Sequence, residues 1–242
     1  GPKADLSYRY DYIGAGPRSL AEVASGKNAF ARVLKSAKRP MLILGAAALT
    51  HPDSGAVMAL AARLADMTGM VGEEWNGFNV LHSAASRVAG LDLGILPAKG
   101  GLGTRAILKG AKAGKIDVVY LLGADEIDMA ALGKAFVIYQ GTHGDAGAHR
   151  ADVILPGAAY TEKSALYVNT EGRPQMTDRA AFPPGDARED WTIIRALSAV
   201  LGKTLDWDTL SEVRSAIFAA HPHLAMIDEV AADNSLDLKK LA

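Results

Sequence analysis

Three loops that begin with glycine are the segments of this sequence whose residue types best suit chemistry. Each follows a run of apolar residues, and together they contain Gly45, Gly123, Asp125, Gly141, His143 and Asp145. Glycine lets the backbone approach a phosphate closely, and a carboxylate such as Asp125 can accept a hydrogen bond from a ribose hydroxyl. The pattern raises the hypothesis of a crevice for a nucleotide-bearing cofactor.

The same loops carry features that oppose such a cofactor. Asp125, Glu126 and Asp145 would place negative charge beside a diphosphate and repel it. The glycines are accompanied neither by GxGxxG nor by GxxxxGK[ST], the motifs that cradle phosphates. We therefore expect ordinary strand-to-helix turns, a vestigial crevice at most, and no cofactor in this chain.

The composition offers little for metal binding or covalent catalysis. The sequence has no cysteine, which removes disulfides and the thiolates that normally ligate iron–sulfur clusters. His143 and His149 are six residues apart and His221 and His223 flank a proline, whereas two histidines of a helical zinc site are spaced i, i+4. No GxSxG motif is present. We predict no metal site and no catalytic residue.

The elements that would position these loops are indicated by the apolar pattern. Continuous runs of β-forming residues are typical of strands buried on both faces, and they occur at 41–44, 116–122, 136–139 and 153–155. Helical spacing is found at 29–39, 52–69, 80–88 and 104–113, and residues 72–79 are expected to form a loop. The alternation predicts an α/β fold with a doubly wound, mainly parallel sheet and helices on both faces.

Three segments are predicted along the chain. Residues 1–27 form a connecting arm, residues 28–166 a Rossmann-like α/β domain, and residues 167–242 a hairpin, a Pro/Gly linker and C-terminal helices packed on the same domain. Asp186 followed by Glu189 resembles a capping box at the start of a helix. Residues 233–242 are expected to be a loosely ordered tail.

Charge and hydropathy exclude two classes of partner. The net charge is −1 with acids and bases interspersed, so we expect no nucleic-acid binding. No apolar stretch approaches the roughly 20 residues needed to cross a bilayer, so we expect no direct membrane insertion. The first residue is Gly rather than Met, and we expect the chain to be a piece of a longer protein.

One motif in the segment 151–175 is specific enough to indicate a family. It has the form A-D-x-x-L-P, then E, then N-x-E-G-R-x-Q, and its residues are Asp152, Pro156, Glu162, Asn169, Glu171, Gly172 and Arg173. This motif resembles the molybdopterin oxidoreductase superfamily. The stretches 121–125, 139–145 and 184–191 look like the branch that contains the large iron–sulfur subunits of respiratory complex I, the NADH:quinone oxidoreductase, and the likeness covers nearly the whole chain.

The resemblance implies a role in an enzyme without chemistry in this chain. In that branch, a cysteine-rich N-terminal part carries iron–sulfur clusters on the path from NADH toward quinone, and we expect that part to be absent here. The implied function is a non-catalytic structural and interaction part of the peripheral arm. Its implied partners are the iron–sulfur part of the same subunit and other peripheral-arm subunits. The implied location is the cytoplasmic face of a bacterial inner membrane or the mitochondrial matrix side.

Two other functions stay open at this point. One is an oxidoreductase module that binds a pterin or dinucleotide cofactor in the strand-end crevice, and the other is a small-ligand sensor using the same crevice. We further expect the polar motif residues to hold the fold. Arg173 would form a buried bridge to Glu162 or Glu171, and the amide of Asn169 would close a turn.

Overall fold

Residues 1–85, 87–230 and 236–242 are described by the computed structural model. Contacts along the chain group them into two units. The first comprises Gly1–Val88, Val168–Arg173 and Glu229–Ala242, and the second comprises Ala89–Tyr167 and Pro174–Asp228. The boundaries predicted after residues 27 and 166 stay a prediction, and the contacts place a further division after Val88.

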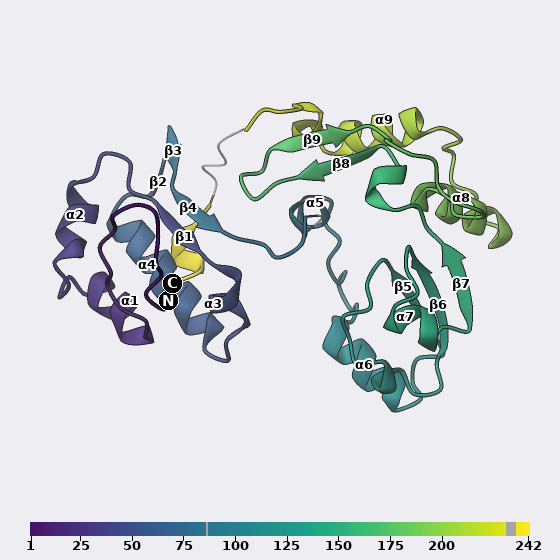
Figure 1. Ribbon diagram of the computed structural model, residues 1–242, viewed down its shortest axis with the longest axis horizontal. Helices are drawn as coiled ribbons and strands as arrows, with labels where there is room; N and C mark the ends of the chain where they lie inside the picture. The colour runs from purple at the N-terminus through teal and green to yellow at the C-terminus, as the bar shows by residue number, and fades with distance from the viewer. Residues whose placement is uncertain (86, 231–235) are drawn as a thin grey trace. The chain divides into compact units, whose positions relative to one another are not determined.

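In the described part of the chain, the first unit contains helices and two pairs of short strands (Figure 1). The helices are α1 (Pro17–Ala24), α2 (Phe30–Ser36), α3 (Ala46–Thr50) and α4 (Ser54–Met67). The strands are β1 (Leu42–Leu44), β2 (Val71–Gly72), β3 (Trp75–Asn76) and β4 (Phe78–Val80), and η4 (Leu238–Lys240) is a short 3-10 helix. β1 pairs in parallel with β4, whereas β2 and β3 form an antiparallel hairpin.

The core of the first unit forms around α4. Its buried residues include Ala61, Ala62 and Ala65, whose small side chains allow neighbouring elements to approach closely. Leu238 of η4 belongs to the same core and is only 6% exposed. The prediction of a loosely ordered tail is therefore wrong for the end of the chain from residue 236, while residues 233–235 lie outside the described residues. Burial of apolar surface by Leu236 and Leu238 supplies the physical reason.

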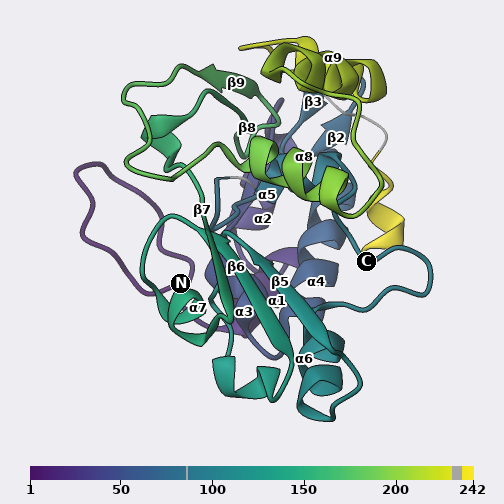
Figure 2. The same ribbon diagram turned by 90° about the vertical axis from the view of Figure 1, so that its right-hand side faces the viewer.

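The second unit is built on a three-stranded parallel sheet in the order β5-β6-β7 (Figure 2). Its strands are β5 (Val118–Leu122), β6 (Phe136–Gly141) and β7 (Val153–Pro156). The hairpin strands β8 (Ala165–Val168) and β9 (Pro174–Thr177) follow, and the division assigns Val168 at the end of β8 to the first unit. Its helices are α6 (Thr104–Lys112), α7 (Ala146–Arg150), α8 (Asp190–Val200) and α9 (Leu210–Ala220), with 3-10 helices η1 (Met129–Leu132), η2 (Tyr160–Glu162) and η3 (Pro222–Ala225). Helix α5 (Arg87–Asp92) spans the division between the two ranges.

Apolar side chains of the parallel strands explain the core of the second unit. Val119 and Leu121 of β5 and Val137 and Tyr139 of β6 are buried together, with Ala111 of α6 packed in the same cluster. The α/β class, with parallel strands and flanking helices, is confirmed. Among the described residues the parallel strands belong to two sheets, the pair β1-β4 and the triplet β5-β6-β7.

The expected loop at 72–79 is wrong, because this stretch forms β3, β4 and part of β2. Trp75 Nε1 donates to the carbonyl oxygen of Pro40 over 2.9 Å, and Gly77 lies so close that a Cβ would be 2.2 Å from the same oxygen. Pairing with β1 thus overrides the loop-like local composition. The helix expected at 80–88 is also wrong in position, since the helix that follows β4 covers Arg87–Asp92, and residue 86 lies outside the described residues.

The predicted capping box at Asp186 and Glu189 is a further correction. Glu189 is itself the residue before the first turn of α8, and no side-chain cap is formed there. The capping box occurs instead at the start of α9, where Thr209 Oγ1 accepts from the Glu212 backbone and Glu212 Oε2 accepts from the Thr209 backbone. This reciprocal arrangement satisfies two donors that a helix start leaves free.

Candidate functional site

The structure brings most of the predicted crevice residues to one edge of the second sheet. Gly123 and Asp125 follow β5. Gly141 is the last residue of the adjacent strand β6, and His143 and Asp145 follow it. The carboxyl ends of these parallel strands therefore meet, as expected for a ligand edge in an α/β sheet. Gly45 belongs to the first unit, where it follows β1 and precedes α3.

The side chain of Tyr139 fills this edge. A Cβ on Gly141 would lie 2.2 Å from Cζ of Tyr139, and a Cβ on Gly147 would lie 2.6 Å from its Cδ2. Tyr139 itself is only 3% exposed. The glycines at these positions therefore make room for an internal aromatic ring, which removes the sequence-based reason to connect Gly141 with a phosphate.

Three carboxylates make this edge of the sheet acidic. Burial raises the pKa of Tyr139, and the negative charges of Asp125, Asp145 and Glu126 raise it further. Asp125 Oδ2 accepts a hydrogen bond from the Gly147 backbone over 3.0 Å, so this carboxylate serves the start of α7. An anionic pterin or dinucleotide pyrophosphate does not fit here, because three carboxylates would repel it and the ring of Tyr139 takes the space.

The histidine of this edge contacts a neighbouring hydroxyl. His143 Nδ1 lies 2.7 Å from Thr142 Oγ1 in an exposed loop. Within the described ranges of the chain, no cluster of three or more His, Cys, Asp or Glu side chains has a geometry suited to a metal ion.

A polar network that the sequence analysis missed lies beside this edge and crosses four segments of the second unit. Gln140 on β6 is fully buried, accepts a hydrogen bond from the hydroxyl of Tyr120 on β5 and donates from Nε2 to Asp190 Oδ1 on α8 over 2.8 Å. The other carboxylate oxygen of Asp190 pairs with the ammonium of Lys163. Burial raises the pKa of Tyr120, and the charge of Asp190 adds to this effect.

The backbone of Gly157 packs closely against this network. A Cβ on Gly157 would lie 2.9 Å from Asp190 Oδ1, and the Gly157 backbone bonds to the carbonyl of Gly141 over 2.9 Å. The side-chain polar atoms of Gln140 and the carboxylate oxygens of Asp190 all have hydrogen-bond partners within the protein. The network therefore fastens α8 to the sheet. A glutamine inside the apolar run of β6 was the one sequence signal that could have revealed it.

The first half of the family-indicating motif holds backbone groups at both ends of β7. Asp152 Oδ2 accepts from the Val137 backbone over 2.8 Å, and Pro156 is the last residue of β7. Glu162 Oε2 accepts from the Ala159 backbone over 2.9 Å at the start of η2. Both carboxylates thus satisfy donors that the strand and the 3-10 helix leave open.

The second half of the motif forms the tight turn between β8 and β9. Asn169 Oδ1 accepts from the backbone N–H groups of Glu171 and Arg173, over 2.9 and 3.1 Å, and Gly172 adopts a φ of 83° that favours glycine. The expected ion pair of Arg173 with Glu171 is present, but it is not buried. Arg173 Nε lies 3.3 Å from Glu171 Oε2, but the two side chains are 33% and 60% exposed.

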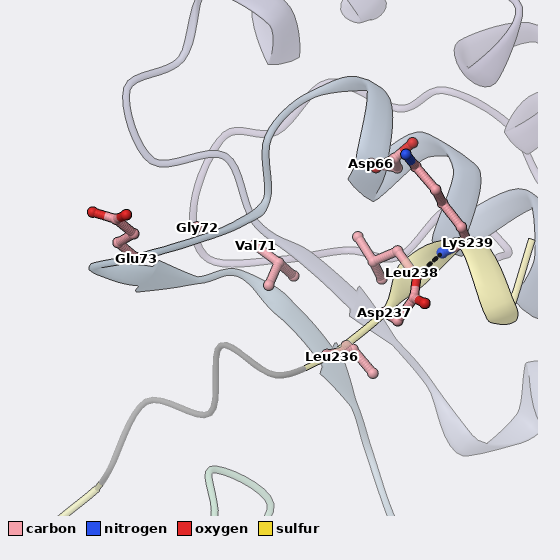
Figure 3. Close-up of a pocket in the computed structure, with 8 residues that line it drawn as sticks. All are labelled: Asp66, Val71, Gly72, Glu73, Leu236, Asp237, Leu238 and Lys239. Atoms are coloured by element: carbon pink, nitrogen blue, oxygen red, sulfur yellow. Dashed lines mark hydrogen bonds between the residues drawn. The ribbon is translucent and has the colours of Figure 1, made fainter.

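One cavity lies in the first unit, and none of the predicted site residues lines it (Figure 3). It has a volume of about 650 Å³ and is lined by Val71, Gly72, Leu236 and Leu238 together with the charged residues Asp66, Glu73, Asp237 and Lys239. The side chain of Lys239 extends toward Asp66, whereas Glu73 points away from the cavity. Its charges are mixed and no reactive group is aimed at a common point, so the cavity indicates no chemistry.

Comparison with known proteins supplies the family. The chain matches the molybdopterin oxidoreductase family over residues 1–200. It is 41% identical over its full length to the NADH-ubiquinone oxidoreductase 75 kDa subunit of Reclinomonas americana, of which it covers 35%.

Two further relatives have similar names. The chain is 44% identical, over 95% of its length, to the mitochondrial NADH dehydrogenase [ubiquinone] iron-sulfur protein 1 of Solanum tuberosum, of which it covers 30%. It is 38% identical, over its full length, to the mitochondrial NADH-ubiquinone oxidoreductase 78 kDa subunit of Neurospora crassa, of which it covers 31%. The chain thus spans about a third of the length of the curated relatives it matches. On the strength of the match over residues 1–200, the chain belongs to the molybdopterin oxidoreductase family.

Proposed function

We propose that this chain is a non-catalytic structural and interaction part of a respiratory NADH:quinone oxidoreductase. The observation that carries the proposal is the identity of 38–44% with three curated subunits of that enzyme, which extends over 95–100% of the chain. At this level of identity over this length, a common fold and a common setting in the larger assembly are expected.

We propose no catalysis in this chain because its candidate polar side chains are hydrogen-bonded within the fold. At the strand-end edge, Asp125 bonds to the backbone of α7 and the buried Tyr139 takes the space between the glycines. Gln140 and Asp190 are bonded to each other, and the motif carboxylates Asp152 and Glu162 hold backbone donors. These groups stabilise the fold, so none of them has the free, converging geometry of a general acid, base or nucleophile.

The proposal includes partners and a location. The iron–sulfur clusters belong to another part of the same subunit, and this chain supports that part and the neighbouring subunits of the peripheral arm. No helix in the described ranges combines the length and apolar character needed to cross a membrane. We place the assembly at the cytoplasmic face of a bacterial inner membrane, or at the matrix side of the mitochondrial one.

Affinity isolation of the full-length protein from membranes of its source tests this function. The tagged protein is expected to co-purify with NADH:quinone oxidoreductase activity and to remain with it through a second, size-based separation. A tagged protein that separates from that activity while staying folded would contradict the proposal.

An oxidoreductase module that binds a pterin or dinucleotide cofactor in the strand-end crevice is the second candidate, and the family match is the observation that favours it. It predicts that NADH, FMN or a guanine nucleotide raises the melting temperature of the purified chain, because a ligand that binds only the folded state stabilises it. Our first proposal predicts no concentration-dependent rise with any of the three.

A further inference from the structure

The second unit has an exposed basic surface whose side chains take no part in the core or in the polar networks described above. Thirteen consecutive residues, 94–106, are exposed, and they include the aliphatic side chains of Ile95, Leu96 and Leu102 at 73%, 62% and 52%. The segment has a defined conformation. The Ile95 backbone donates to the Gly90 carbonyl over 2.8 Å, and the Gly101 backbone donates to the Ala98 carbonyl over 2.7 Å.

The charge of this segment is concentrated. Residues 93–116 contain Lys99, Arg105, Lys109, Lys112 and Lys115 and no acidic residue, so the segment carries +5. Because the whole chain has a net charge of −1, the remainder carries −6. The expectation that acids and bases are interspersed is therefore wrong for this segment.

Helix α6 presents three of the cations on one face. Arg105, Lys109 and Lys112 are spaced i, i+4 and i+7, which places them along one side of a helix. Leu108 and Ala111, on another side, pack into the core of the second unit. The burial of Leu108 and Ala111 therefore holds the cationic face in place.

The five cations have no counter-charge among the described residues. Some other basic side chains are paired, as in Arg150 with Asp152, Lys163 with Asp190 and Arg195 with Asp208, whereas scattered surface lysines such as Lys3, Lys27 and Lys203 form no ion pair with a described residue. None of the residues Lys99, Arg105, Lys109, Lys112 or Lys115 forms an ion pair with a residue that the structure describes. An exposed row of cations of one sign attracts a surface of opposite sign.

The residue types of the segment favour one class of partner. It contains no Trp, Tyr or Phe, whereas interfacial membrane anchors use aromatic side chains and single-stranded nucleic acids stack on them. Exposed aliphatic residues flanked by charges are instead the composition of a protein interface with an apolar centre and a polar rim.

We propose that residues 94–115, the basic docking surface, bind an acidic surface of a neighbouring protein subunit. The aliphatic residues Ile95, Leu96 and Leu102 form the apolar centre of the contact, and the five cations steer and orient the partner. This inference rests on the proposed function, because it takes the partner to be another protein of the same assembly.

Charge reversal in the full-length protein, expressed in its source, tests the inference. The variant combines Arg105→Glu, Lys109→Glu and Lys112→Glu, and its incorporation into the assembled oxidoreductase is quantified on native gels. The matched control combines Lys3→Glu, Lys27→Glu and Lys203→Glu, which are exposed and change the net charge equally. We expect incorporation of the first variant to fall by about tenfold or more, with the loss growing at lower salt, and the control to match the wild type.

The outcomes separate the two proposals. If the wild type is absent from the oxidoreductase, the proposed function is wrong. If the wild type and both variants are incorporated equally, the proposed function stands and the docking surface is wrong. A third measurement, sedimentation of the purified chain with phosphatidylglycerol vesicles, identifies a lipid surface as the occupant if only the α6 variant fails to bind, and that result would also overturn the inference. Equal melting temperatures of the variants exclude a folding defect.

Discussion

The amide of Gln140, fully buried on β6, donates a hydrogen bond of 2.8 Å to the carboxylate of Asp190 at the first turn of α8. The two residues are fifty positions apart in the sequence, and the same amide accepts from the hydroxyl of Tyr120. Both the oxygen and the nitrogen of this buried amide are hydrogen-bonded, so the amide links β5 and β6 to α8. Any substitution that removes one partner leaves the others unsatisfied.

Gln140→Leu is expected to destabilise the chain. The substitution keeps the approximate volume but leaves the Tyr120 hydroxyl and Asp190 Oδ1 without their partner, which costs about 1–3 kcal/mol. Chemical denaturation followed by circular dichroism measures the change. Gln175→Leu is the control, because Gln175 on β9 is exposed. An equal loss of unfolding free energy in both variants would show that the hydrogen bonds of Gln140 do not stabilise the fold.

Gly141→Ala tests whether the glycine serves the ring of Tyr139. A Cβ at this position would lie 2.2 Å from Cζ of Tyr139, so the ring must shift, and overpacking of this kind costs about 1–3 kcal/mol. Gly144→Ala is the matched control, since a Cβ there meets no atom within 4 Å. Both variants are compared by thermal unfolding. If Gly141→Ala left the melting temperature unchanged, Tyr139 would not fill the strand-end edge as described.

Stability at alkaline pH is expected to depend on Tyr120. Burial and the charge of Asp190 raise its pKa in the folded protein, so the unfolded chain loses this proton first. The contribution of Tyr120 is therefore complete below the unfolded pKa of about 10 and is lost as the pH rises through the folded pKa. Tyr120→Phe should flatten the fall of unfolding free energy between about pH 9 and 11 relative to the wild type. Tyr8→Phe, at an exposed side chain, should leave that slope unchanged.

The turn residues of the family motif are expected to differ in importance. Asn169→Ala removes an acceptor for two backbone donors, whereas Glu171→Ala removes a carboxylate that is 60% exposed and pairs with Arg173 over 3.3 Å. We expect a loss of unfolding free energy of about 1–2 kcal/mol for the first variant and of about 0–1 kcal/mol for the second. Urea unfolding of the two variants decides the order, and a larger loss for Glu171→Ala would contradict these roles.

Local patterns in the sequence were sufficient for most elements of the fold. The apolar runs at 116–122 and 136–139 became β5 and β6, and the helical spacing at 104–113 became α6, because burial and chain-local hydrogen bonds decide such segments. The strands at 71–80 could not be predicted, since they depend on pairing with β1 and on the contact of Trp75 with Pro40. Those partners are distant in the sequence.

The sequence predicted where the candidate site lies in the fold, but not which side chains fill it. The strand-end loops do bring Gly123, Asp125 and Gly141 to one edge, as parallel topology requires. That Tyr139 occupies this edge could not be inferred, because the direction of a side chain at the end of a strand depends on the packing of the neighbouring helix. The link from Gln140 to Lys163 through Asp190 was hidden for the same reason, since it joins three segments that are remote in sequence.

The content of molybdenum, tungsten and iron in the freshly purified chain is the measurement that tests the central claim most directly. Inductively coupled plasma mass spectrometry on protein that has passed a size-exclusion step gives these amounts per mole of chain. Because the strand-end edge is acidic and filled by Tyr139, and because the sequence has no cysteine, we predict far less than stoichiometric amounts of all three metals. Near-stoichiometric metal that survives repurification would contradict the account of this chain as a structural part without a redox centre.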